Sequence, residues 1–109
     1  MADTKPSRAL ADVAAERQRQ ITGEGYNHAH DDAHEDFELS RAASVYALFA
    51  AMPARDRDFA MRHGPHLYGS NVVWPWGREH LNLTTRRADL VKAGALILAE
   101  IERLDRKEG

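Results

Sequence analysis

Apolar residues recur at helical spacing in four segments of the chain, and polar or turn-forming residues separate these segments. The first predicted helix follows an N-cap at Ser7 and ends near Thr22, where Gly23 and Gly25 stop it. Its predicted inner face consists of Leu10, Val13, Ala14, Arg17 and Ile21.

A second helix is predicted over residues 33–52, after a loop over residues 26–31. Asp32 fits its N-cap, with Glu35 three residues on in a capping-box pattern, and Pro53 ends it. Its predicted buried stripe is Leu39, Ala42, Ala43, Tyr46, Phe49 and Ala50.

A short third helix is predicted over residues 54–62, followed by a Gly- and Pro-containing loop over residues 64–83 with extended pieces around residues 71–73. Loops this long in a small domain are often functional. The last helix starts after Thr84 or Thr85 and runs to about Lys107. Its apolar positions are Leu90, Gly94, Ile97, Ile101 and Leu104, widened by Val91, Ala95 and Leu98. So wide an apolar surface predicts a central helix or a subunit interface.

These elements predict an all-α fold, a small bundle of three main helices plus a short one, in one domain over residues 1–109. Long two-sided helices in a small chain favour a homo-oligomer that completes the bundle. The net charge of -2 and the pI near 6.3 argue against binding to duplex nucleic acid. With no cysteine, no signal-peptide pattern and no long apolar run, we expect a cytoplasmic protein without a membrane span.

The densest cluster of titratable residues lies between His28 and Glu38. Asp31, Glu35 and Glu38 share one face of a helix, and Glu35 and Glu38 form an E-x-x-E pair. Two carboxylates at this spacing can hold Mg²⁺ together with the phosphates of a substrate, and Asp32 lies beside them. The alternative is that these acids only cap the helix and favour its dipole.

The histidines of the same cluster have a separate interpretation. His30 and His34 are spaced four residues apart, with His28 close by, and together with Asp31 they could bind Zn²⁺. No H-E-x-x-H pattern is present, so a surface histidine cluster is the favoured interpretation.

Two tryptophans and a group of basic residues lie in and after the long loop. Trp74 and Trp76 could stack on a nucleobase, although filling a core or an interface is the more common role of such rings. Arg86 and Arg87 lie near the start of the last helix and could contact phosphates, or could simply be solvated.

Taken together, four segments resemble a known family: the run from Glu16 to Ile21, the Gly-rich loop ending in Asp31-Asp32, Glu35-x-x-Glu38 with Arg41-Ala42-Ala43, and the last helix from Asp89 to Leu104. They resemble the small, often phage-encoded, MazG-like proteins among the all-α nucleoside triphosphate pyrophosphohydrolases. The resemblance covers most of the chain and is weakest over residues 53–83.

The resemblance implies an oligomeric helical enzyme that cleaves nucleoside triphosphates to the monophosphate and pyrophosphate. Mg²⁺ would be held by Glu35 and Glu38 and, from a second motif, by Asp89, with Asp31 or Asp32 assisting and Glu38 accepting a proton. Lys92 stands where that second motif has an acid, so it reverses a charge in the implied metal site.

Lys92 therefore distinguishes two functional hypotheses. If Glu35, Glu38 and Asp89 converge and Lys92 points away, an enzyme is favoured. If Lys92 enters the carboxylate cluster, binding of a nucleotide or a cyclic signalling nucleotide without turnover is favoured. In a phage protein, such sequestration would counter a host defence. In this second hypothesis, the ligand would be held by Lys92, Arg86, Arg87, Trp74 and Trp76. A helical protein-interaction module is the third alternative.

Overall fold

The protein is built from helices, and a computed structural model describes residues 5–25, 27–33, 37–63 and 74–108. The elements, in chain order, are α1 (Arg8–Gly23), α2 (His28–Asp32), α3 (Glu38–Ala51), α4 (Ala54–His63), the 3-10 helix η2 (Arg78–His80) and α6 (Arg86–Glu108). No strand occurs in these ranges, which confirms the predicted all-α class.

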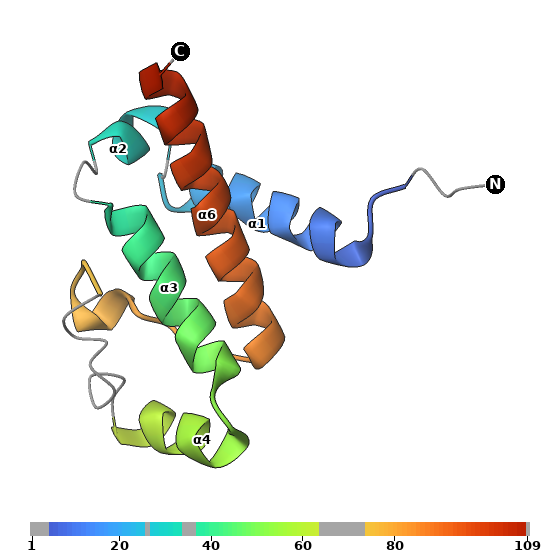
Figure 1. Cartoon of the computed structure of the whole chain (residues 1–109), viewed down its shortest axis with the longest axis vertical. Helices are drawn as coiled ribbons and strands as arrows, with labels where there is room; N and C mark the ends of the chain where they lie inside the picture. The colour runs from blue at the N-terminus through green and yellow to red at the C-terminus, as the bar shows by residue number, and fades with distance from the viewer. Residues whose placement is uncertain (1–4, 26, 34–36, 64–73, 109) are drawn as a thin grey trace.

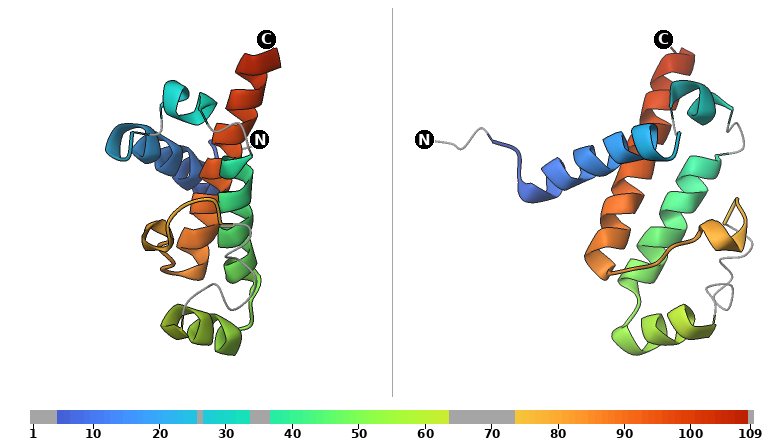
Figure 2. Two further views of the ribbon diagram at one scale, coloured as in Figure 1. Left: turned by 90° about the vertical axis from the view of Figure 1, so that its left-hand side faces the viewer. Right: turned by 180° about the vertical axis from the view of Figure 1, so that it is seen from behind.

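Helix α6 is the central element, because α3, α1 and α2 all pack against it. α3 and α6 run antiparallel and side by side, and α1 crosses α6 at a steep angle (Figure 1). Figure 2 shows that α1, α2 and the segment around η2 all lie on the same side of the α3–α6 pair. The other side of this pair carries no further described element.

The core lies mainly between α3 and α6. Every member of the stripe predicted for α3, from Leu39 to Ala50, is buried, which confirms that part of the prediction. Ala93, Leu96 and Ala99 of α6 pack against it, and Trp74 closes one end. The core therefore packs large side chains, most of them from α3, against small residues of α6.

The predicted ends of three helices are confirmed. The Ser7 side chain accepts a hydrogen bond from the backbone N–H of Leu10, as an N-cap does. Thr85 does the same for Ala88 at the start of α6. Pro53 separates α3 from α4, and α4 covers the predicted third helix.

The predicted organisation between residues 26 and 38 is wrong in two respects. Residues 28–32 form the short helix α2 and not a loop, because the Asn27 side chain caps it by accepting from the N–H of His30. Asp32 is therefore the last residue of α2 and not the N-cap of the next helix. That helix, α3, starts only at Glu38, after Phe37 has adopted a left-handed φ of 65°. The capping partner Glu35 and the extended pieces predicted around residues 71–73 lie outside the described residues.

The inner faces predicted for the first and last helices also need correction. Of the face predicted for the first helix, Arg17 is buried as expected, but Leu10 is 59% exposed, and the other buried residue of α1 is Gln20, which was not assigned to that face. The reason is the steep crossing of α1 over α6 (Figure 1), which leaves the first turn of α1 uncovered. On α6, the apolar positions at steps of four and three are mostly exposed, and a neighbouring face with more alanine forms the core.

The sequence predicted no membrane-spanning segment, and the described helices agree with that prediction. None of them combines the length and the apolar character that crossing a bilayer requires.

Candidate ligand-binding pocket

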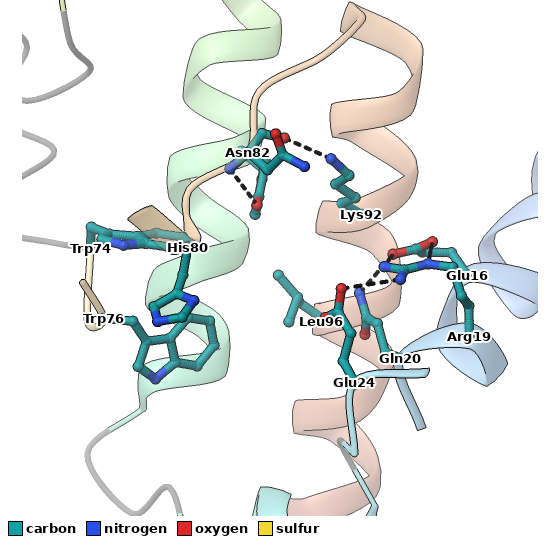
Figure 3. Close-up of a pocket in the computed structure, with 11 residues that line it drawn as sticks. Glu16, Arg19, Gln20, Glu24, Trp74, Trp76, His80, Asn82, Lys92 and Leu96 are labelled. Carbon is teal, nitrogen blue, oxygen red and sulfur yellow. Dashed lines mark hydrogen bonds and ion pairs between the residues drawn. The ribbon is translucent and has the colours of Figure 1, made fainter. Parts of the chain in front are cut away.

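A hollow of about 220 Å³ opens where α1, α3, α6 and the segment around η2 meet. Aromatic side chains form one wall, charged side chains from α1 form the opposite wall, and Lys92 and Asn82 lie at the edge between them (Figure 3). The lining residues are Glu16, Arg19, Gln20, Glu24, Tyr46, Trp74, Trp76, His80, Asn82, Lys92 and Leu96.

The aromatic wall is a chain of edge-to-face contacts. The ring centroids of Tyr46 and Trp74 are 5.7 Å apart, and those of Trp74 and Trp76 are 5.4 Å apart, with interplanar angles near perpendicular, 84° and 87°. The indole N–H of Trp74 donates to the Gly77 carbonyl at 3.0 Å, which closes the loop that carries both tryptophans. Trp74 is buried in the core and Trp76 is only half-buried, so Trp76 keeps an accessible surface on a fixed support.

The charged wall is a hydrogen-bonded group on α1 and at its end. Arg19 donates to both carboxylate oxygens of Glu16 at 2.7 Å and to Glu24 at 3.1 Å. The hydrogen bond from Arg19 lowers the pKa of Glu16 below the ordinary value of a glutamate, and that bond raises the pKa of Arg19. With two carboxylates and one guanidinium, this wall keeps one net negative charge, and the charge of Lys92 also acts on Glu16 and helps to lower its pKa.

Lys92 is the cation of the pocket that no carboxylate neutralises directly. Its Nζ donates to the backbone carbonyl of Asn82 at 2.6 Å and lies 5.5 Å from the centroid of the Tyr46 ring. Tyr46 in turn accepts a hydrogen bond from the N–H of Asn82, and burial raises the pKa of its phenol. In the described part of the chain Lys92 forms no ion pair, so its charge is available to an anionic ligand.

Gln20 supplies an unsatisfied polar atom at the same place. Its side-chain nitrogen donates to Glu16 at 3.2 Å, but its oxygen is buried and accepts no hydrogen bond from any described residue. The residue is only 3% exposed. A buried acceptor without a donor carries a desolvation penalty, which a ligand that donates to it would remove.

The predicted metal ligand Asp89 is fully buried away from this pocket. One of its carboxylate oxygens accepts from Arg57, and the other accepts from the backbone N–H of Thr84. Both oxygens are thus used within the fold, where they fix the start of α6 against α4.

Asp31 has a similar environment, at the other end of the molecule. Its two oxygens contact Arg17 at 2.8 Å and the ring nitrogen of His30 at 3.0 Å, and its side chain is fully buried. Arg17 also pairs with Glu102 of α6, so this cluster ties α1 and α2 to α6. Asp32 points outward and pairs with Arg106 at 2.7 Å, which raises the pKa of that guanidinium.

Glu38 and Asp89 do not converge within one chain. Glu38 is the first residue of α3, whereas the Arg57 that binds Asp89 also donates to the carbonyl of Phe49, near the last turn of α3. Eleven residues of helix place these positions about 16 Å apart along the axis. Glu35 lies outside the described residues.

The described acids therefore do not fit a magnesium cage. Within the described ranges, no three His, Asp or Glu side chains form a group that could hold a metal ion. Of the histidine cluster, only the His30 ring is described, in contact with Asp31, so the zinc hypothesis has no described set of ligands.

Of the five predicted nucleotide contacts, three meet in the pocket, namely Trp74, Trp76 and Lys92. The other two are used elsewhere. Arg86 donates to the carbonyls of Ala50 and Met52 and caps the end of α3, and Arg87 pairs with Asp12 at 2.8 Å.

The sequence analysis missed the contributions of α1 and of Tyr46, His80 and Asn82 to this pocket. A signal existed in α1, where Glu16, Arg19 and Gln20 are spaced so that they share a face. What that face meets depends on the angle at which α1 crosses α6, which is a tertiary property that local spacing does not give.

Comparison with models of protein families, with curated proteins and with solved structures finds no match. The resemblance to MazG-like proteins therefore stays an expectation that rests on short motifs.

Proposed function

We propose that the pocket binds a nucleotide, and that it does so without hydrolysing it. The observation that carries the proposal is the position of Lys92, a cation that forms no ion pair in the described part of the chain and lines the same hollow as three aromatic rings. A negatively charged group linked to a flat aromatic ring is the ligand that such a combination suits, and a nucleotide has both parts.

The phosphate end would be recognised by Lys92. An ammonium group acts on phosphate as a point charge, and partial burial strengthens that attraction. Arg19, Arg86 and Arg87 are less suited to this role, since they are engaged with Glu16, with backbone carbonyls and with Asp12, respectively. Binding would thus depend mainly on Lys92.

The base would stack on the aromatic wall. Stacking on an aromatic side chain contributes about 1–3 kcal/mol per base. The unsatisfied oxygen of Gln20 favours a base that carries an exocyclic amine, because such an amine donates a hydrogen bond. The hollow of about 220 Å³ is below the range of roughly 300–1,000 Å³ that is common for ligand pockets, so part of the nucleotide would extend into solvent.

Hydrolysis is not part of the proposal, because the acids that the resemblance implies are neutralised by arginine or far from Lys92. Asp89 and Asp31 are both buried in ion pairs. Pyrophosphohydrolase activity and Mg²⁺ binding stay predictions that depend on Glu35. Sequestration of a nucleotide or a cyclic signalling nucleotide is the biological class that fits best. Since such ligands occur in the cytoplasm, we expect the protein to act there.

Isothermal titration calorimetry with a panel of ribonucleoside, deoxyribonucleoside and cyclic nucleotides tests the proposal. At least one ligand should bind, and Lys92→Met should weaken it about tenfold or more, the effect of losing one charge-assisted contact. Lys107→Met, an exposed lysine on the same helix, is the matched control and should change nothing. If no nucleotide binds the folded protein, the proposal is wrong and the helical interaction module becomes the favoured function.

A further inference from the structure

A second hollow lies beside the pocket, and the two share part of their lining. The second hollow has a volume of about 340 Å³, against about 220 Å³ for the first. Glu16, Arg19 and Lys92 line both, and Glu16 and Arg19 belong to the side of the first hollow that lies opposite the tryptophans (Figure 3). The first hollow alone is smaller than most ligand pockets, whereas the two together fall within the usual range of roughly 300–1,000 Å³.

The two hollows follow one another along both helices that form them. On α6 the order is Ala88 and Val91 for the second hollow, Lys92 for both, and Leu96 for the first. On α1 the order is Asp12 and Ala15 for the second hollow, Glu16 and Arg19 for both, and Gln20 for the first. Because the order is the same on both helices, the hollows form one groove along the crossing of α1 and α6, with Lys92 in its middle.

The second hollow does not suit further phosphate groups. Its arginines are paired, Arg87 with Asp12 at 2.8 Å and Arg19 with Glu16 at 2.7 Å, so each of them brings a carboxylate that repels a phosphate. Apart from Lys92, the other lining residues are Ala15, Ala88 and Val91. An uncharged group with an apolar face fits this lining better, and hydroxyl groups on its edge can donate to the carboxylates.

We propose that the ligand is a dinucleotide, two nucleosides joined through phosphate, with that phosphate at Lys92. One base stacks on the aromatic wall, and the second nucleoside lies over Ala88 and Val91. This inference rests on the proposed function, because it keeps the phosphate at the same lysine and adds what occupies the far side of it. A mononucleotide would leave the larger hollow empty, and a longer phosphate chain would lie against Asp12.

Calorimetry with matched ligands tests the inference on the whole chain. The ligands are the monophosphate, the triphosphate, the linear dinucleotide and the cyclic dinucleotide of adenosine, guanosine and cytidine, since each of these bases carries an exocyclic amine. For the base that binds most tightly, a dinucleotide should bind about tenfold or more tighter than the monophosphate and the triphosphate, because it alone contacts both hollows. The linear and cyclic ligands distinguish the two forms of linkage.

The variant Ala15→Phe supplies the second measurement, since a phenyl ring at this exposed position would occupy the second hollow. The advantage of the dinucleotide over the monophosphate should then disappear. Ala14→Phe is the matched control, because it adds the same ring to the neighbouring exposed alanine, which lines neither hollow, and it should keep the wild-type advantage. Circular dichroism checks that both variants stay folded.

The outcomes separate this inference from the proposed function. Equal affinities of the wild-type chain for a monophosphate and a dinucleotide would overturn the inference and leave nucleotide binding standing. A triphosphate that binds as tightly as the dinucleotide would also overturn it, and so would an unchanged advantage in a folded Ala15→Phe variant. If neither mononucleotides nor dinucleotides bind, the proposed function itself is wrong.

Discussion

Arg57 donates a 2.5 Å hydrogen bond to Asp89 and so joins α4 to the first turn of α6. Both side chains are buried, and the same guanidinium also donates to the carbonyls of Phe49 and Thr84. The chain therefore uses one arginine to neutralise a buried acid and to hold three segments together. This relationship occupies the Asp89 carboxylate within the fold, whereas Lys92, one turn along α6, lines the pocket.

Replacement of Arg57 should destabilise the protein strongly. Arg57→Met leaves the Asp89 carboxylate buried without a partner, and we expect a loss of about 3–5 kcal/mol in the free energy of unfolding. Urea denaturation followed by circular dichroism measures this loss. The double variant Arg57→Met/Asp89→Leu removes both charges and should recover part of it, because the hydrogen bonds to Phe49 and Thr84 remain lost.

Arg55→Met is the matched control for this prediction, because Arg55 is an exposed arginine on the same helix. It should change the free energy of unfolding by less than about 0.5 kcal/mol. Equal losses in Arg55→Met and Arg57→Met would contradict the role given to the buried pair.

Glu16 should contribute to the loss of stability in acid. Because its pKa is lowered in the folded chain, its contribution is complete above the ordinary value of 4.5 and is lost as the pH falls through the lower folded value. In the Glu16→Gln variant, the melting temperature should therefore fall less steeply as the pH drops below 4.5. Thermal melts from neutral to acidic pH measure the slope, with Glu79→Gln, an exposed carboxylate, as the control for loss of one charge.

The close approach of α1 to α6 predicts coupling between Gly94 and Val13. A Cβ at position 94 would lie 3.2 and 3.3 Å from the two methyl groups of Val13. Overpacking typically costs about 1–3 kcal/mol, whereas Gly→Ala inside a helix gains up to about 1 kcal/mol. Gly94→Ala should thus be more favourable in a Val13→Ala background than in the wild type, by about 1 kcal/mol or more. Equal effects in the two backgrounds would mean that the helices do not meet there.

The proposal that the pocket binds a nucleotide without hydrolysing it is testable with Mg²⁺ and nucleoside triphosphates. Pyrophosphate release should stay at the level of a protein-free control, because the described acids do not assemble a metal site. Glu38→Gln should then leave nucleotide affinity unchanged. Mg²⁺-dependent release that disappears in Glu38→Gln would instead support the pyrophosphohydrolase that the resemblance implies.

The sequence predicted well what depends on local pattern. The buried stripe of α3 follows from helical spacing, and the ends of α1, α4 and α6 follow from caps and proline. The region before α3 was predicted wrongly because two residues, Asn27 and Asp32, are both suited to an N-cap, and only Asp32 was assigned as one. Asn27 starts a short helix there, and the left-handed conformation of Phe37 has no signature in the residue type itself.

The pocket was predicted only in part, for a related reason. Trp74, Trp76 and Lys92 stood out as residue types suited to nucleotides. Gln20 did not, since its role arises from the angle at which α1 crosses α6. Likewise, the partner of Asp89 lies 32 residues away in the sequence, and no local pattern links the two.

The most direct test of the account is a tryptophan fluorescence titration, because both tryptophans of the chain line the pocket. Addition of the nucleotide that binds should change the emission in a saturable way, and Lys92→Met should shift the midpoint about tenfold or more to higher concentration. Trp76→Ala should weaken binding as measured by calorimetry. Emission that no nucleotide alters, in a protein that stays folded, would contradict the account.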